Sequence, residues 1–67
     1  MELIDTVTKL AQLRISKNIS QRELSLRLEK DTTYINKVET GRFNVGIQSL
    51  LDICKILEID IIDLFKK

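Results

Sequence analysis

The sequence contains no histidine, no proline, no tryptophan, one cysteine and two glycines among its 67 residues. With so few helix breakers it offers no flexible linker, and a single cysteine excludes an internal disulfide. The absence of histidine removes the commonest general base, and no Gly-rich loop is present to cradle a phosphate. The acidic residues are scattered along the sequence and form no catalytic or metal-binding cluster. We therefore expect a protein that is not an enzyme and binds no metal or cofactor.

Long apolar runs are missing as well. None exceeds three residues, whereas a membrane helix needs about 20. No basic segment precedes an apolar stretch near the N-terminus, as it would in a secretory signal. We expect a cytoplasmic protein with no membrane partner, and the length predicts a single domain over residues 1–67.

The composition, 43% hydrophobic and 31% charged, suits a compact all-α protein, and its periodicity predicts a bundle of five short helices. The first should span about residues 3–17 and stop at Asn18, a residue type that tolerates positive φ. Ser20 and Glu23 form a capping box that starts the second helix.

The last three helices have their own boundary residues. Asp31 is placed to cap the third helix and Gly41 to end it. The fourth carries apolar residues at six positions: Ile47, Leu50, Leu51, Ile53, Cys54 and Leu57. Cys54 is therefore predicted to be a core residue and not a reactive thiol. Asp60 should cap a final helix over about residues 60–66.

The segment from residue 20 to residue 41 has the shape of a helix-turn-helix. Polar residues at i, i+1, i+4, i+5 and i+8 share one face of its second helix: Thr32, Thr33, Asn36, Lys37 and Thr40. Ile35 and Val38 point the other way and can anchor the helix to a core. An ordinary solvated face is the alternative interpretation. A helix that packs against the core on one side and exposes polar side chains on the other suits the major groove of DNA, whose base edges are read by hydrogen-bonding side chains.

Charge is distributed in favour of the same segment. The whole chain carries a net charge of only +1. Residues 14–42, however, hold seven basic and four acidic side chains, a net of +3, whereas residues 1–13 and 43–67 each have a net of −1. Positive charge is thus concentrated around the helix-turn-helix, as a phosphate-facing surface requires.

These residues resemble the phage-repressor and Cro type of helix-turn-helix domain, also called the XRE family of bacterial transcription regulators. Three runs carry the resemblance: LRISKNISQREL (13–24), TTYINKVETGRFN (32–44) and SLLDICKILEIDIIDLF (49–65). They cover nearly the whole chain without insertions. The resemblance implies a sequence-specific DNA-binding regulator. Stand-alone members include phage-type repressors, controller proteins of restriction–modification systems and antitoxins, and TYI followed by a Pro-free loop favours the controllers.

Carried over by position, the resemblance implies a role for ten residues. Base contacts are implied for Thr32, Thr33, Asn36 and Lys37. Contacts with the DNA backbone are implied for Gln21, Tyr34, Arg42 and Asn44. Asn36 is suited to adenine and Lys37 to guanine, and Gln21 would hold a phosphate at a helix N-terminus. Arg14 and Glu39 would form a buried ion pair that ties the first helix to the third.

The chain departs from the family pattern at three places. Glu29 occupies the turn position usually given to glycine, so a left-handed conformation there would cost about 1 kcal/mol. Ser25 stands at the usual small-residue position where the two helices cross. Val45 replaces a frequent proline and Gly46 a serine cap, so the loop before the fourth helix should be less constrained.

The end of the chain carries more apolar residues than one buried stripe needs. Part of this surplus, Ile61, Ile62 and Phe65, is predicted to form a dimer interface. A dimer would present two recognition helices about 34 Å apart to an inverted-repeat operator. The alternative function is a protein-interaction module, such as an antitoxin, for which DNA binding is secondary. The near-neutral net charge favours that alternative.

Overall fold

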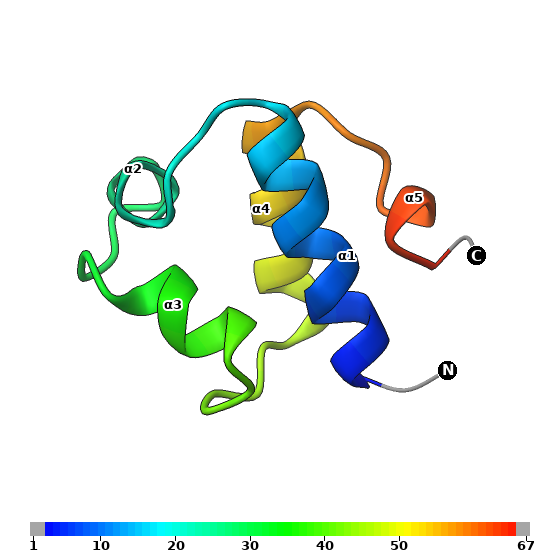
Figure 1. Cartoon of the computed structure of the whole chain (residues 1–67), viewed down its shortest axis with the longest axis horizontal. Coiled ribbons are helices and arrows are strands. Elements are labelled where there is room, and N and C mark those ends of the chain that lie inside the picture. The colour runs from blue at the N-terminus through cyan, green and yellow to red at the C-terminus, as the bar shows by residue number, and fades with distance from the viewer. Residues whose placement is uncertain (1–2, 66–67) are drawn as a thin grey trace.

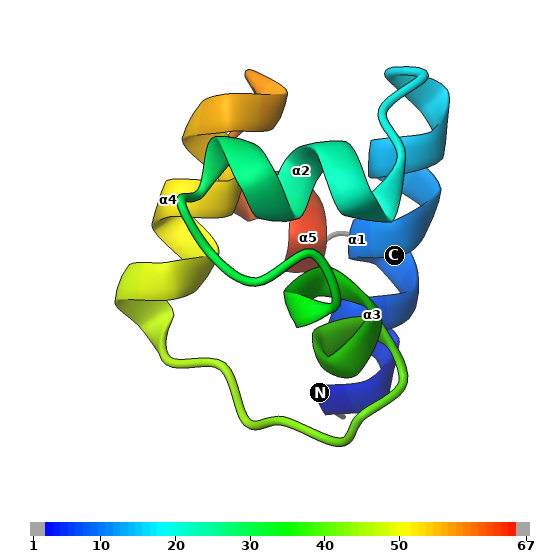
Figure 2. The same ribbon diagram turned by 90° about the vertical axis from the view of Figure 1, so that its left-hand side faces the viewer.

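The computed structural model describes residues 3–65, and this part of the chain is all-helical, as predicted. Five helices follow one another: α1 Leu3–Ser16, α2 Gln21–Arg27, α3 Tyr34–Glu39, α4 Ile47–Leu57 and α5 Ile62–Phe65. In Figure 1, α1 crosses in front of α4 at the centre, with α2 and α3 on one side and α5 on the other. Figure 2 shows α2 and α3 together at the front, between α1 and α4. The helix-turn-helix and α5 therefore occupy opposite sides of the molecule.

All five helices contribute to one hydrophobic core. Its buried apolar residues are Val7, Leu10, Leu24, Ile35, Val38, Leu50, Ile53, Cys54, Leu57 and Leu64. Cys54 is only 3% exposed, as its prediction as a core residue requires. Burial raises the pKa of the Cys54 thiol above its usual value, and the nearby charges of Asp60 and Asp63 raise it further. The thiol is therefore held neutral and unreactive.

Left-handed residues close four of the helices. Asn18 after α1 and Gly41 after α3 have φ values of +59° and +76°, as predicted for helix stops. Glu29 after α2 keeps the family's left-handed turn with φ +60° although it is not glycine. Glu58, at the C-cap of α4, also has a positive φ, +58°, which the sequence had not indicated. Each non-glycine residue in this region costs about 1–2 kcal/mol.

The capping predictions hold in part. The Ser20 hydroxyl accepts the Glu23 backbone N–H at 2.9 Å and starts α2. In a complete capping box the Glu23 carboxylate would also accept the Ser20 backbone N–H. Here it pairs instead with Arg27, one turn later. Asp60 does not cap α5 in the expected way: its carboxylate accepts the Ile62 N–H, two residues on, at 3.1 Å and closes the turn before the helix. Gly46 caps α4 with its backbone alone.

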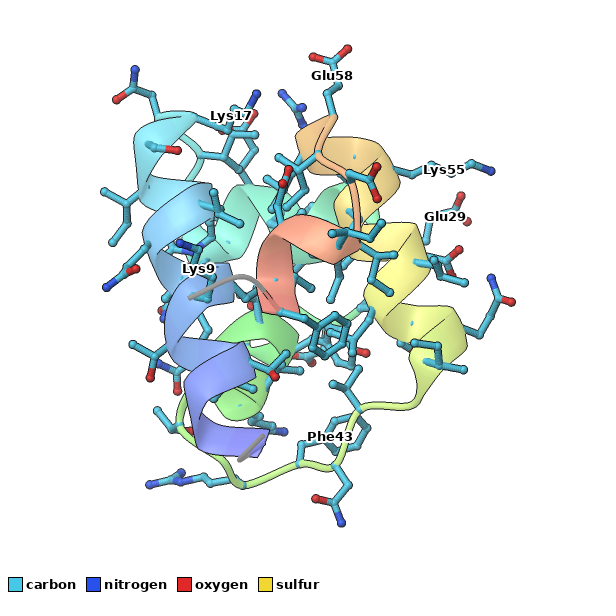
Figure 3. All side chains as sticks on the ribbon, turned by 90° about the vertical axis from the view of Figure 1, so that its right-hand side faces the viewer. Lys9, Lys17, Glu29, Phe43, Lys55 and Glu58 are labelled. Atoms are coloured by element: carbon cyan, nitrogen blue, oxygen red, sulfur yellow. The ribbon has the colours of Figure 1, made fainter. Side chains whose placement is uncertain are left out.

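The two C-terminal helices bury fewer apolar residues than their sequences suggested. Ile47 and Leu51 on α4 are 61% and 40% exposed, so the buried stripe of this helix is narrower than its apolar content. In the short α5, Leu64 is buried, while Ile62 and Phe65 are 58% and 44% exposed. Ile61, which was assigned to a dimer interface, precedes α5 and is half-buried against the core. Figure 3 shows this side of the molecule, with α5 in front of α1 and α4.

No helix between residues 3 and 65 is both long and apolar enough to cross a membrane. Over the same residues, no three or more acidic or cysteine side chains are grouped in a way that could hold a metal ion.

Candidate nucleic-acid interface

The short helix α3 has one buried and one open face. Ile35 and Val38 are fully buried in the core, while Asn36 and Lys37 are exposed on the opposite side. Helical periodicity alone produces this division, because residues 35 and 38 lie one turn apart. The structure therefore offers an amide and an ammonium group to solvent from a helix that the core holds in place.

The start of α3 differs from the prediction. The helix begins at Tyr34, so Thr32 and Thr33 lie in the preceding turn and not on the helix. Asp31 does not cap the helix directly: its carboxylate accepts the Thr33 backbone N–H at 2.9 Å and the Thr33 hydroxyl at 2.7 Å. These bonds lower the pKa of the Asp31 carboxyl, the side-chain bond most strongly. Both threonines remain exposed beside Asn36, and the Thr33 hydroxyl is oriented by its bond to Asp31.

Thr40 closes the polar face at the other end of α3. Its hydroxyl donates to the Asn36 backbone carbonyl at 2.8 Å. The same carbonyl also accepts the Thr40 backbone N–H at 3.0 Å, so both bonds hold Thr40 at the C-terminus of α3.

Behind α3 lies the ion pair that the family resemblance implied. Arg14 Nε donates to Glu39 Oε2 at 2.7 Å, and the two side chains are 10% and 7% exposed. A second guanidinium nitrogen contacts Glu39 Oε1 at 3.2 Å, and a third donates to the Ile19 carbonyl at 2.7 Å. Arg14 therefore joins α1, the α1–α2 connection and the end of α3 in one charged cluster.

Gln21, assigned to a DNA phosphate, has both polar side-chain atoms engaged within the protein. Its Nε2 donates to Glu39 Oε1 at 2.8 Å, and its Oε1 accepts from Asn36 Nδ2 at 3.3 Å. Gln21 is also the first residue of α2, where backbone N–H groups are free of intrahelical partners. In this structure the Gln21 side chain is thus bound to α3, while the backbone N–H groups at the start of α2 have no partner within the helix.

A small aromatic cluster flanks α3 beside the loop of residues 40–46. Tyr34 packs half-buried against the core, with its ring edge-on to Phe43 at a centroid distance of 5.4 Å. The Lys30 ammonium group lies 5.6 Å from the centre of the Tyr34 ring. Arg42 and Asn44 are exposed on the same loop. The cluster thus positions a basic, polar edge next to α3.

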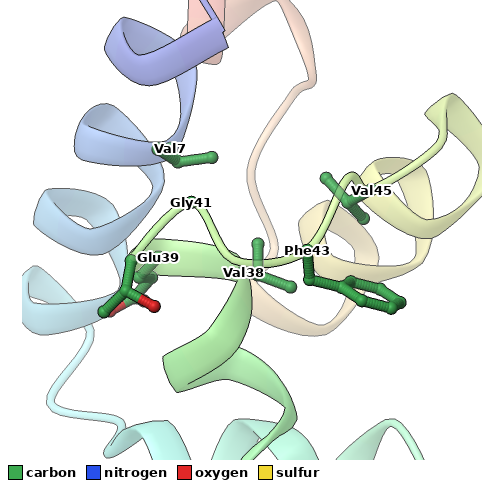
Figure 4. Close-up of a pocket in the computed structure, with 7 residues that line it drawn as sticks. Val7, Val38, Glu39, Gly41, Phe43 and Val45 are labelled. Carbon is green, nitrogen blue, oxygen red and sulfur yellow. The ribbon is translucent and has the colours of Figure 1, made fainter.

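A cavity of about 410 Å³ opens beside this loop. Among the described residues, its lining is mostly apolar: Val7, Val38, Glu39, Thr40, Gly41, Phe43 and Val45. Figure 4 shows Val7 on α1 near the loop that carries Gly41, Phe43 and Val45. The cavity is lined by buried Val38 of α3 and meets the polar face only at Thr40.

The hydroxyl of Ser25 is a functional group that the sequence did not reveal. It accepts the Ile35 backbone N–H at 3.0 Å and donates to the Gln21 carbonyl at 2.8 Å, with no exposed surface. One buried side chain therefore fixes the start of α3 against α2. The available indication in the sequence was a serine at the helix crossing, a position usually considered only for the small size of its side chain.

Together these features define a helix-turn-helix whose second helix presents a polar, locally basic face. A family model described as "Helix-turn-helix" matches residues 10–64. The chain therefore belongs to this family, the XRE-type helix-turn-helix proteins. It is a DNA-binding transcription regulator, and its family points to a non-enzymatic role.

A solved structure is similar to almost the whole of this chain. The restriction-modification controller protein C.AhdI from Aeromonas hydrophila is 32% identical to this chain, with a TM-score of 0.85. The match covers 94% of this chain and 96% of C.AhdI. Among curated protein sequences, none matches.

Proposed function

We propose that this protein is a controller-like regulator that binds an inverted-repeat operator as a homodimer, with α3 in the major groove. The observation that carries the proposal is the construction of α3. Its apolar side is fully buried, and the opposite side presents Asn36 and Lys37. Operator occupancy would then block polymerase or recruit it. The similarity to a restriction-modification controller protein supports this assignment.

Four side chains are proposed to read bases: Thr32, Thr33, Asn36 and Lys37. The backbone is contacted by the N-terminus of α2 at Gln21, by the Tyr34 hydroxyl, and by Arg42 and Asn44 on the loop. All of these residues are half-buried or exposed and lie on or beside α2 and α3. The arrangement combines base readout with positioning contacts to phosphate, which protein–DNA interfaces require together.

The exposed apolar surface of α5 supports the homodimer. Ile62 and Phe65 are exposed on the side of the molecule opposite α2 and α3 (Figure 1). Two copies joined through this surface keep both α3 helices free. To read an inverted repeat, the two α3 helices of such a dimer must lie on one face and about 34 Å apart, one helical turn of duplex.

The direct test is selection of bound sequences from a random duplex library, followed by titration of the selected site at two salt concentrations. An inverted repeat with half-sites about 10 base pairs apart is the expected result. Affinity should fall steeply as salt rises, because several phosphate contacts release counterions. Recovery of no enriched sequence, with weak salt-sensitive binding only, would contradict the proposal.

Replacing Asn36 with alanine should weaken binding to the selected operator by about 1–3 kcal/mol per half-site. The loss is expected to be confined to one base position, because the amide can pair with only one base edge at a time. Repeating the selection with the variant and titrating single-base operator changes would measure it. Gln12→Ala, an exposed amide on α1, serves as the control and should bind like wild type.

Replacing Phe65 with aspartate should raise the dimer Kd by at least about tenfold, because the interface would bury an unpaired carboxylate. Sedimentation equilibrium at tens of micromolar would detect the change. Leu26→Asp is a matched control, since Leu26 is 50% exposed on α2, away from α5. A wild-type protein that is monomeric at this concentration would overturn the dimer.

A protein-interaction module is the second candidate. It is favoured by the same exposed apolar residues, Ile62 and Phe65, and by a net charge of only +1. In that case the α5 variants would abolish binding of a protein partner, and duplex selection would yield no operator.

A further inference from the structure

A chain of hydrogen bonds runs from the buried ion pair to the exposed face of α3. Arg14 holds Glu39, Glu39 Oε1 accepts from Gln21 Nε2 at 2.8 Å, and Gln21 Oε1 accepts from Asn36 Nδ2 at 3.3 Å. Gln21 is the link between a carboxylate with almost no exposure and an amide on the exposed face of α3. The three elements α1, α2 and α3 each contribute to the chain.

The direction of this chain follows from the chemistry of its buried end. The Glu39 carboxylate beside Arg14 can only accept hydrogen bonds, so Gln21 must turn its NH₂ group toward it. The Gln21 carbonyl oxygen then faces Asn36. Because that oxygen can only accept, Asn36 must direct its own NH₂ group toward Gln21.

Asn36 is left with one free N–H and its carbonyl oxygen for a ligand. A donor and an acceptor side by side on one amide match the major-groove edge of adenine, which offers N7 as acceptor and N6–H as donor. Rotating the amide by half a turn would exchange the two groups and break the bond to Gln21. The network therefore sets which group stands where before any ligand arrives, which lowers the ordering cost of binding.

We propose that Gln21 is a specificity-determining positioning residue that fixes the orientation of the Asn36 amide, so that α3 selects adenine at the base pair that Asn36 reads. This role rests on the proposed function and adds to it the source of the base preference. It differs from the phosphate contact first assigned to this side chain. A lost phosphate contact weakens binding to every sequence, whereas a lost positioning contact changes preference at one base pair.

The first arm of the test uses the DNA-free protein. Gln21→Met keeps an unbranched side chain but has no amide. In wild type, the side-chain ¹⁵N–{¹H} NOE of Asn36 should indicate an ordered amide, and in Gln21→Met it should fall to the range of a free surface amide. Gln12→Met, made at an exposed glutamine on α1, is the matched control and should leave that NOE unchanged.

The second arm measures base preference on the selected operator. Gln21→Met should reduce discrimination between adenine and the other bases at one position by about fivefold or more. Affinity for the adenine operator should therefore fall more than affinity for operators altered at that position or for non-specific duplex. In an Asn36→Ala background the same substitution should cause no further loss of discrimination, because the group that Gln21 acts through is gone. Circular dichroism verifies folding, and Gln21→Ala is the second variant if Gln21→Met does not fold.

The outcomes separate this role from the proposed function. If wild type selects no sequence, the proposed function and this role are both overturned. If wild type selects an operator but Gln21→Met loses affinity equally on every sequence, this role alone is overturned. The same holds if the Asn36 NOE does not differ between wild type and Gln21→Met.

Discussion

Replacing Arg14 with alanine is expected to lower the free energy of unfolding by about 3–5 kcal/mol. The substitution leaves the Glu39 carboxylate, only 7% exposed, without its charge partner. It also removes the donor to the Ile19 carbonyl at the α1–α2 connection. A domain of this size has a total stability of only about 3–10 kcal/mol, so this loss should remove roughly a third or more of it. Urea denaturation followed by circular dichroism at 222 nm, a standard readout, would measure the loss.

A surface ion pair within the same chain provides the control. Arg27 pairs with Glu23 along α2, but these side chains are 50% and 44% exposed, so Arg27→Ala should cost no more than about 0.5 kcal/mol. Removing both buried charges together, as Arg14→Met with Glu39→Met, should cost less than Arg14→Ala, because no unpaired charge remains. A loss below about 1 kcal/mol in Arg14→Ala would contradict a buried pair.

Replacing Ser25 with valine is expected to lower the free energy of unfolding by about 2–6 kcal/mol, through two separate effects. The Ile35 N–H loses its buried acceptor, which is worth about 1–3 kcal/mol. The second branch also enlarges a side chain that has no exposed surface at the α2–α3 crossing, and overpacking of this kind adds about 1–3 kcal/mol. Denaturation would measure the total, and the start of α3 should lose protection from hydrogen exchange first.

Two further serine variants separate these effects. Ser25→Ala removes the acceptor without adding volume and should cost only about 1–3 kcal/mol. Ser16→Ala removes an exposed hydroxyl that bonds the Leu13 carbonyl and should stay within about 0.5 kcal/mol of wild type. If Ser25→Ala were as stable as wild type, the Ile35 N–H would have an alternative partner, and the hydroxyl would not be what holds α3.

Local patterns in the sequence were sufficient to predict the number and order of the helices. Apolar periodicity identified them, and Ser20, Asn18 and Gly41 correctly placed three of their ends. The predicted start of α3 was wrong because an aspartate at this place can serve either of two purposes. An aspartate can cap a helix or close a turn by accepting the N–H two residues on. The sequence around Asp31 does not distinguish them, and the structure uses the turn.

Contacts between residues that are distant in the sequence were harder to predict. The Gln21–Asn36 bond joins residues 15 apart, and the Ser25–Ile35 bond joins residues 10 apart. Both depend on side-chain rotamers, which periodicity does not specify. The exposure of Ile47 and Leu51 was not predicted either, because it depends on the packing of other helices: α4 carries more apolar positions than its neighbours can cover. The Arg14–Glu39 contact was available only through the family resemblance.

The left-handed helix ends have a consequence for how this protein can evolve. Asn18, Glu29 and Glu58 each hold a conformation that glycine would adopt at lower cost, and all three are exposed. A lineage that exchanged one of them for glycine would gain stability without altering the face of α3. Destabilising changes at Asn36 or Lys37 would then become tolerable, because a more stable protein stays above its folding threshold. New operator preferences are thus most accessible to descendants that first exchanged one of these helix-end residues for glycine.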